Sequence, residues 1–141
     1  MPSATKTVEM NVSPEKLISV ITDFESYPAF IPEMKSAKVV RSGDGFWDVK
    51  FSVQMIRSLE YTLHLEQVSP YSVRWSLLEG VFKANNGSWE LEEINGGAGT
   101  RATYTVDIQV GMFLPKTVVR SLVGKSLPIM LGQFRKRAES L

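Results

Sequence analysis

Apolar and polar residues alternate with a period of two over most of the chain between Ser36 and Val110. This is the spacing of strands that have one buried face and one face in water. The alternation is clearest over residues 47–55, 59–66, 71–77 and 100–110, and glycine-rich turn sequences occur at 42–45 and 95–99. Such turns between alternating segments are typical of hairpins. The pattern therefore predicts a meander of antiparallel strands with one apolar face.

The region before Ser36 combines a further strand with helical signals. Residues 4–12 are predicted to form a first strand, and Ser13-Pro14-Glu15 has the capping serine, early proline and early acid of a helix start. This helix should end before Tyr27-Pro28, because the residue ahead of a proline disfavours helical angles. Residues 27–32 are then expected to form a compact apolar turn or second short helix.

The last thirty residues return to helical spacing. We expect a long helix that begins near Pro115 and is interrupted between Gly124 and Pro128, since an internal proline removes a hydrogen bond and clashes with the preceding turn. Its apolar stripe would contain Val118, Val119, Leu122, Val123, Leu127, Met130, Leu131 and Phe134. Only this helix is long enough to cover the apolar face of the sheet. The sequence thus predicts one α+β domain over residues 1–141, with about seven antiparallel strands wrapped around the C-terminal helix.

Composition excludes several classes of protein. The chain has 43% hydrophobic and 22% charged residues, the balance of an ordinary globular domain, and it has no cysteine. Disulfide frameworks, thiolate metal sites and cysteine nucleophiles are therefore excluded. The first residues do not resemble a signal peptide, and no apolar stretch approaches the length of a membrane span. We expect a cytoplasmic protein.

Charge is distributed unevenly along the chain. Residues 1–111 contain ten lysines and arginines against fourteen aspartates and glutamates, whereas residues 112–141 contain six against one. A basic C-terminal helix suits a peripheral contact with an anionic membrane. The favoured interpretation is simpler, with the cations solvating the outer face of the helix and complementing its dipole. Six charges are too few for a nucleic-acid surface, so no nucleic-acid partner is predicted.

One segment resembles a known family. The sequence from Val20 to Pro32, with Asp23, Tyr27-Pro28 and Phe30-Ile31-Pro32, is similar to the segment between the paired short helices of the START-like (SRPBCC) superfamily, in its polyketide cyclase/dehydrase and coenzyme Q-binding-protein branch. Weaker matches are Glu79-Gly80-Val81-Phe82, Asn86-Gly87-Ser88-Trp89 and residues 99–104. The resemblance implies a helix-grip fold with an apolar cavity between sheet and helix.

A departure from this pattern narrows the resemblance. Coenzyme Q-binding and ribosome-associated members often have Pro-Gly-Cys at the end of the first motif, whereas this chain has Pro32-Glu33-Met34. The difference favours the broader cyclase/dehydrase-like group, and no ribosome partner is expected.

Few side chains suit catalysis. The single histidine, His64, shares the polar face of its strand with Glu60, Thr62 and Glu66, so strand parity places it in water. One histidine without cysteine makes a zinc site improbable. We therefore predict no catalytic residue, no metal and no cofactor.

Bulky apolar residues on the concave face stand out instead, and a cavity with a few polar groups on apolar walls is the usual form of a small-molecule site. The residues expected to bind such a molecule are Trp47, Phe51, Met55, Tyr61, Leu63, Trp75, Leu77, Phe82, Trp89, Tyr104, Val106, Val119, Val123 and Met130. The first hypothesis is a non-enzymatic carrier of a lipid, quinone or polyketide-like molecule. The alternatives are a cyclase or dehydratase that uses Tyr61, Tyr104 or Arg74, and a protein-interaction module.

Overall fold

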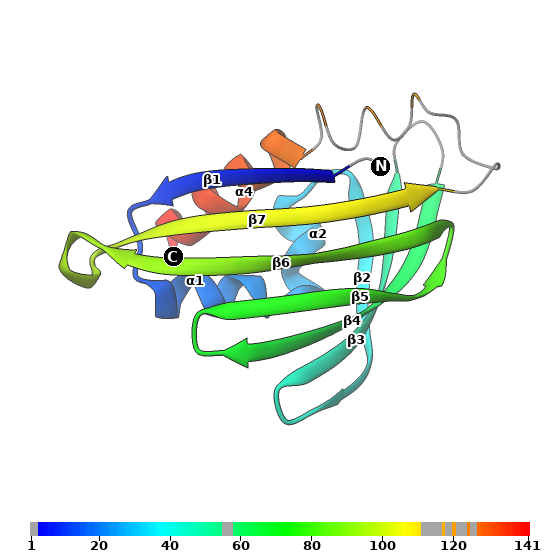
Figure 1. Cartoon of the computed structure of the whole chain (residues 1–141), viewed down its shortest axis with the longest axis horizontal. Helices are drawn as coiled ribbons and strands as arrows, with labels where there is room; N and C mark the ends of the chain where they lie inside the picture. Colours follow the sequence, from blue (N-terminus) through cyan, green and yellow to red (C-terminus); the bar gives the residue numbers. More distant parts are fainter. Residues whose placement is uncertain (1–2, 55–57, 111–116, 118–119, 121–123, 125–126) are drawn as a thin grey trace.

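The structure is a computed structural model that describes residues 3–54, 58–110, 117, 120, 124 and 127–141. The order of its elements is strand, short helices, six strands and a terminal helix (Figure 1). The bounds are β1 Ser3–Met10, α1 Pro14–Ile21, η1 Phe24–Ser26, α2 Tyr27–Phe30, β2 Met34–Gly43, β3 Phe46–Gln54, β4 Ser58–Ser69, β5 Ser72–Gly80, β6 Phe82–Ile94, η2 Asn95–Gly97, β7 Gly99–Val110 and α4 Leu127–Ser140.

The strands form a single seven-stranded sheet in the order β1-β7-β6-β5-β4-β3-β2, with every neighbouring pair antiparallel. Strands β2 to β7 follow one another as a meander, and β1 crosses to pair with β7. The sheet curves, and α1, α2 and α4 all lie behind it in the view of Figure 1, on its concave side. This arrangement confirms the predicted α+β helix-grip fold. The assignment of residues 1–141 to one domain stays a prediction.

The start of α1 has the predicted capping chemistry. The Ser13 hydroxyl accepts a hydrogen bond of 3.2 Å from the backbone N–H of Lys16, and Pro14 occupies the first helical position, where its missing N–H costs nothing. Leu17 and Ile21, one turn apart, are buried against the sheet. The cap and this apolar face together fix α1 across one end of the concave side.

The terminal helix α4 carries part of the predicted apolar stripe. Leu127, Leu131, Phe134 and Ala138 recur at helical spacing and are buried. Pro128 is the second residue of α4, a position that tolerates proline. The expected start near Pro115 and most of the expected break between Gly124 and Pro128 lie outside the described residues.

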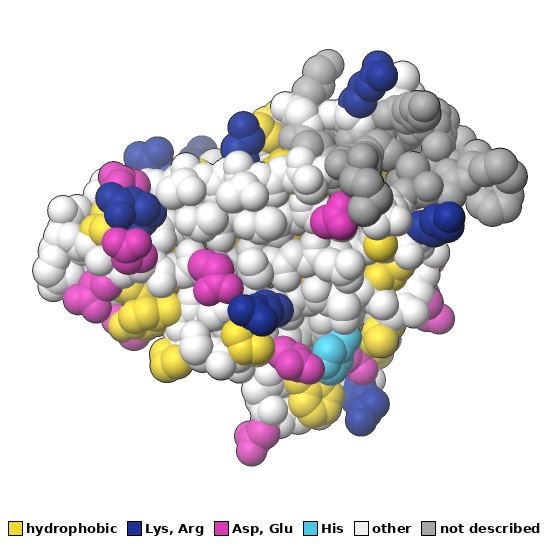
Figure 2. All heavy atoms as spheres, viewed as in Figure 1, with side chains coloured by type: hydrophobic (Ala, Val, Ile, Leu, Met, Phe, Trp, Pro, Cys, Tyr) yellow, Lys and Arg dark blue, Asp and Glu magenta, His cyan; other side chains and the backbone are white. Residues whose placement is uncertain are grey.

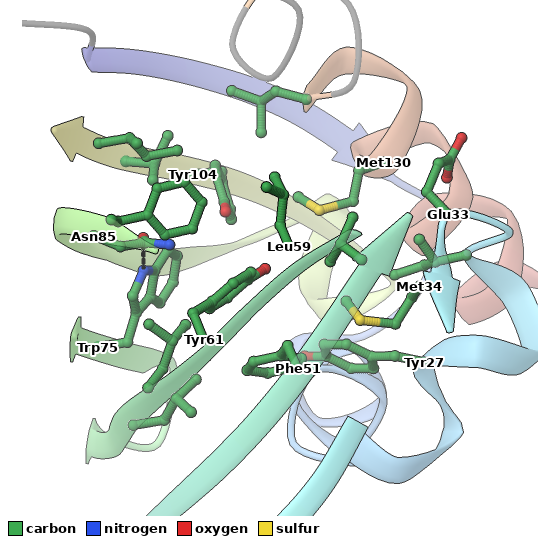
Figure 3. A pocket seen from close by; sticks show the side chains of 18 of the residues that line it. Tyr27, Glu33, Met34, Phe51, Leu59, Tyr61, Trp75, Asn85, Tyr104 and Met130 are labelled. Atoms are coloured by element: carbon green, nitrogen blue, oxygen red, sulfur yellow. Dashed lines mark hydrogen bonds between the residues drawn. The ribbon is translucent and has the colours of Figure 1, made fainter. Parts of the chain in front are cut away.

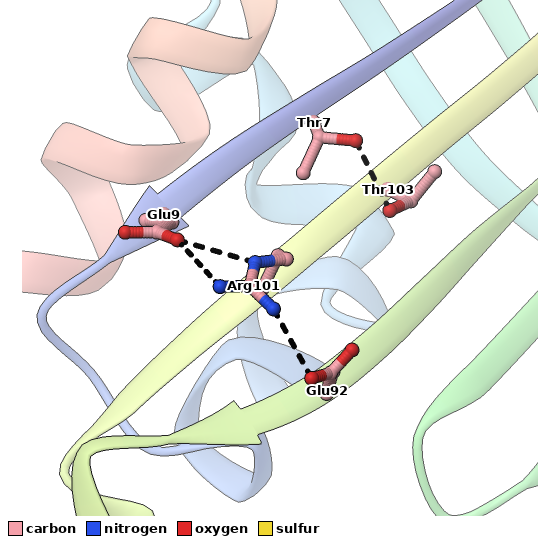
Figure 4. A network of polar contacts seen from close by, with 5 residues as sticks. All are labelled: Thr7, Glu9, Glu92, Arg101 and Thr103. Atoms are coloured by element: carbon pink, nitrogen blue, oxygen red, sulfur yellow. Dashed lines mark hydrogen bonds and ion pairs between the residues drawn. The ribbon is translucent and has the colours of Figure 1, made fainter.

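The opposite face of the sheet is polar (Figure 2). Its clearest cross-strand contact is Arg101 of β7, which pairs with Glu9 of β1 at 3.0 Å and with Glu92 of β6 at 3.1 Å (Figure 4). Thr7 and Thr103 lie 3.3 Å apart by their hydroxyls along the same pair of strands. These ion pairs stabilise the register of β1, β7 and β6, because a slip of one residue would turn the charged side chains toward the core.

Candidate functional site

A cavity of about 160 Å³ lies between the concave face of the sheet and helices α2 and α4 (Figure 3). Its lining is predominantly apolar and aromatic, with a few polar side chains from β4, β6, β7 and the turn before β2. The lining residues are Tyr27, Ile31, Glu33, Met34, Phe51, Val53, Leu59, Tyr61, Leu63, Leu65, Trp75, Phe82, Asn85, Trp89, Tyr104, Val106, Ile108, Leu127, Met130 and Phe134.

Nine of the fourteen residues predicted from the sequence line this cavity. They are Phe51, Tyr61, Leu63, Trp75, Phe82, Trp89, Tyr104, Val106 and Met130. Trp47 and Leu77 do not. The Trp47 ring packs edge-on against Phe24 of η1, 5.4 Å between centroids. Trp47 is therefore in contact with the helices and does not reach the cavity. Met55, Val119 and Val123 lie outside the described residues.

The sequence interpretation missed several lining residues, for different reasons. Leu59, Leu65 and Ile108 share strand faces with residues that were predicted, so parity alone would have found them. Tyr27 and Ile31 belong to the family-like segment, whose contact with the sheet is a tertiary feature. Other missed residues are Glu33, Met34, Val53, Leu127 and Phe134.

Asn85 was also missed, although it has the strand parity of Trp89 and pairs with Ile108, which lines the cavity as well. The register between β6 and β7 shifts between Phe82 and Ala84, so Phe82 and Asn85, three positions apart, both face the cavity. Without the bulge, Phe82 would have the parity of the outer face.

Two glycines let large side chains lie close to the sheet. A Cβ on Gly87 would stand 2.3 Å from the Trp75 indole, and a Cβ on Gly80, where φ is 135°, would stand 2.5 Å from the Tyr61 Cα. The absence of a side chain at these positions allows Trp75 to lie over β6 and allows β5 to approach Tyr61 closely. Both aromatic side chains are thereby held in the cavity lining.

Three tyrosines line the cavity. Among the described residues, the hydroxyl of only one of them forms a hydrogen bond. The Tyr27 hydroxyl donates to the carbonyl oxygen of Ile21 at 2.5 Å. Tyr61 and Tyr104 approach from different strands with their hydroxyls toward the cavity interior (Figure 3). Within the described residues, neither hydroxyl has a hydrogen-bond partner.

Burial holds these phenols in their neutral form. Loss of hydration raises the pKa of Tyr61 to about 12, and burial together with the nearby Tyr61 raises the pKa of Tyr104 further above its ordinary value. Both hydroxyls are therefore protonated at neutral pH and are available as hydrogen-bond donors.

His64 lies on the outer face of the sheet, as strand parity predicts (cyan in Figure 2). It faces Asp48 directly across the β3–β4 register. Its Nδ1 is 2.6 Å from Asp48 Oδ1 and its Nε2 is 2.8 Å from Glu66 Oε1, so the ring is held between two carboxylates and is only partly exposed. These hydrogen bonds and charges raise the pKa of His64. The histidine therefore has a structural ion-pair environment remote from the cavity.

This arrangement predicts a small pH-dependent contribution to stability. Because the pKa of His64 is higher in the folded chain, its pairing stabilises the fold below the unfolded pKa of about 6.5, and this is lost as the pH rises through the folded pKa. We expect His64→Gln to lower the free energy of unfolding by up to about 1 kcal/mol at pH 5.5 and by less at pH 8.5. Urea unfolding at both pH values measures the difference. A larger loss at pH 8.5 would contradict the pairing.

Other kinds of site have no support in the described part of the chain. No group of three or more His, Asp or Glu side chains there is arranged to hold a metal ion. None of the described helices combines the length and apolarity needed to cross a membrane.

A curved antiparallel sheet that closes around a terminal helix, with an apolar cavity between them, defines a START-like ligand-binding domain. Residues 10–135 match the family described as polyketide cyclase/dehydrase and lipid transport. The chain belongs to this family.

Solved structures share this fold. A START superfamily protein from Mycobacterium smegmatis has a TM-score of 0.84 at 23% identity and covers 98% of this chain and 97% of its own. The Zhui aromatase/cyclase from Streptomyces sp. R1128 also has a TM-score of 0.84, at 15% identity, over 97% of this chain and 93% of its own.

Among curated proteins, the ribosome association toxin RatA of Escherichia coli K12 is 25% identical over 96 residues, 67% of this chain and 61% of RatA. The persistence and stress-resistance toxin PasT of another Escherichia coli strain is 26% identical over 99 residues, 70% of this chain and 63% of PasT. The chain thus matches less than two thirds of the length of either relative.

Proposed function

We propose that this chain binds a hydrophobic small molecule in the cavity between the sheet and α4 and carries it without chemical change. The observation that supports this proposal most strongly is the chemistry of the lining, in which aromatic and aliphatic side chains surround two neutral phenols. Burial of apolar ligand surface would supply most of the affinity.

Apart from Glu33, the described lining residues are poorly suited to proton transfer. The only histidine of the chain lies on the other face of the sheet, and the high pKa of the Tyr61 phenol makes it a weak acid at neutral pH. Arg74, the other group considered for an enzymatic role, is exposed and lies 3.9 Å from Glu90 on the outer face. These features favour binding over catalysis.

The alternative proposal is a cyclase or dehydratase that uses the same cavity. Glu33 favours it, because this carboxylate lies in the lining and provides a group that can accept a proton. The two proposals differ in the fate of the bound molecule, since an enzyme would release it with a new ring or with one water fewer.

Other partners have less support from the described residues. On α4, Arg135 pairs with Glu139 at 3.3 Å and the Arg137 guanidinium lies over the Phe30 ring, so two of its cations have intramolecular contacts. A membrane contact through the basic C-terminal segment stays a prediction, as does the expected lack of a ribosome partner. RatA, a relative at 25% identity, is named for ribosome association.

Native mass spectrometry of protein purified from its own cells tests the proposed function. We expect a population heavier than the bare chain, which solvent extraction returns to the bare mass. The extracted molecule, offered again to the empty protein, should be recovered unchanged. Recovery of a cyclised or dehydrated product would support the enzymatic alternative. Protein that shows only the bare mass before extraction would contradict both proposals.

A further inference from the structure

Several hydrogen-bond donors in the cavity have no acceptor within hydrogen-bond distance among the described residues. The Tyr61 and Tyr104 hydroxyls have no partner among the described residues, although both rings are packed tightly. Tyr61 contacts Phe51 and Phe82 at 5.5 and 5.1 Å between centroids, and Tyr104 contacts Trp89 at 4.9 Å. The rings are therefore fixed by their neighbours, whereas the hydroxyls are left for a ligand.

Asn85 adds a third donor of defined orientation. The Trp75 indole Nε1–H lies 3.2 Å from the Asn85 side chain. An indole N–H only donates, so the amide atom that faces it must be the oxygen. The amide nitrogen, with two N–H groups, is left without an acceptor among the described residues, and Asn85 is buried in the lining.

The charge of the lining restricts the ligand further. Among the described lining residues there is no lysine or arginine, and Glu33 is the single charged side chain. A carboxylate or phosphate buried here would lose its hydration without gaining an opposite charge, which is strongly unfavourable. A lining that has hydrogen-bond donors but no cationic side chain suits a ligand whose acceptor group is neutral.

We propose that the ligand is a neutral, largely apolar molecule with a carbonyl oxygen that accepts hydrogen bonds from Tyr61 and Tyr104, with Asn85 as an additional donor. This inference rests on the proposed function, because it specifies the chemistry of the molecule that the cavity binds. Fatty acids and phosphorylated lipids are disfavoured by the same lining. A carbonyl-bearing ring system satisfies both the apolar contacts and the free donors.

A matched pair of probes distinguishes the binding of an apolar molecule from the recognition of a carbonyl group. The cavity of about 160 Å³ is similar in size to an engineered cavity of about 150 Å³ that holds one benzene ring. Small bicyclic probes are therefore suitable. Indane and 1-indanone share a carbon skeleton and differ by the exchange of one CH₂ for a carbonyl, so indane reports apolar binding and 1-indanone adds the acceptor.

The variant is Tyr61→Phe/Tyr104→Phe, and the control is Tyr27→Phe. Tyr27 also lines the cavity, but its hydroxyl already donates to Ile21. Since one neutral hydrogen bond corresponds to a few-fold change in affinity, we expect the double variant to bind 1-indanone about tenfold more weakly and indane with less than about twofold change. Tyr27→Phe should affect both probes equally. Isothermal titration calorimetry gives these affinities.

The carbonyl stretch of bound 1-indanone is a direct readout of the hydrogen bonds. In the wild-type protein it should lie at a lower wavenumber than in an apolar solvent, and in Tyr61→Phe/Tyr104→Phe it should return toward the apolar value. A wild-type frequency equal to that in apolar solvent, or equal losses of affinity for both probes, would overturn the carbonyl assignment while leaving the proposed function standing. Failure of both probes to bind would contradict the proposed function itself.

Discussion

Phe134→Ala is expected to lower the free energy of unfolding by about 3–5 kcal/mol, the range for truncation of a buried phenylalanine. Phe134 is 2% exposed and joins α4 to an aromatic cluster of the core. Its ring meets Tyr27 at 5.1 Å, Phe30 at 5.2 Å and Trp89 at 5.2 Å between centroids. The substitution therefore removes contacts to both short-helix and sheet layers at once.

Denaturant unfolding of the wild type and of two variants measures this effect. Ile129→Ala is the matched control, because Ile129 lies on the same helix but is 54% exposed, and its loss should change stability by no more than about 0.5 kcal/mol. Similar small losses for both variants would show that α4 does not pack against the sheet as described.

Leu63→Phe is expected to weaken the binding of an apolar probe by at least about tenfold while changing the free energy of unfolding by less than about 1 kcal/mol. The larger side chain would occupy the cavity that Leu63 lines. Val106→Phe, on β7, should behave in the same way. In a solid core either change would over-pack and cost about 1–3 kcal/mol.

Val49→Phe provides the control for this prediction. Val49 lies directly across the β3–β4 register from Leu63 and is fully buried, but it does not line the cavity. We expect Val49→Phe to lose about 1–3 kcal/mol of stability, because no free volume receives the ring. Equal destabilisation by Leu63→Phe and Val49→Phe in chemical unfolding would mean that Leu63 lies in a filled core.

The strand meander was predictable because one face of the sheet is wet. A two-residue period then appears in the sequence, and it correctly placed residues such as Tyr61, Leu63 and Trp75 on the concave face and His64 on the other. The short helix after β1 was predictable from Ser13 and Pro14, since capping depends on local sequence.

The remaining part of the site depends on tertiary packing. Trp47 has the same parity as Phe51, but its position along the strand places it against Phe24. Periodicity reports which face a residue occupies, whereas the position of helices over that face decides between cavity and core. Asn85 has the parity of Trp89, but its burial beside the Trp75 indole is likewise a result of tertiary packing.

The most direct test of the central claim is a titration with indane followed by tryptophan fluorescence. Trp75 and Trp89 line the cavity, so binding there should change their emission saturably. It should also raise the free energy of unfolding by RT ln(1 + [L]/Kd), about 2.7 kcal/mol at a hundredfold excess over Kd. The account predicts both effects in the wild type and in Val49→Phe, whereas Leu63→Phe should need at least about tenfold more indane for saturation and should be stabilised less at the same indane concentration. An emission that changes only linearly with indane, with no stabilisation of the wild type, would contradict it.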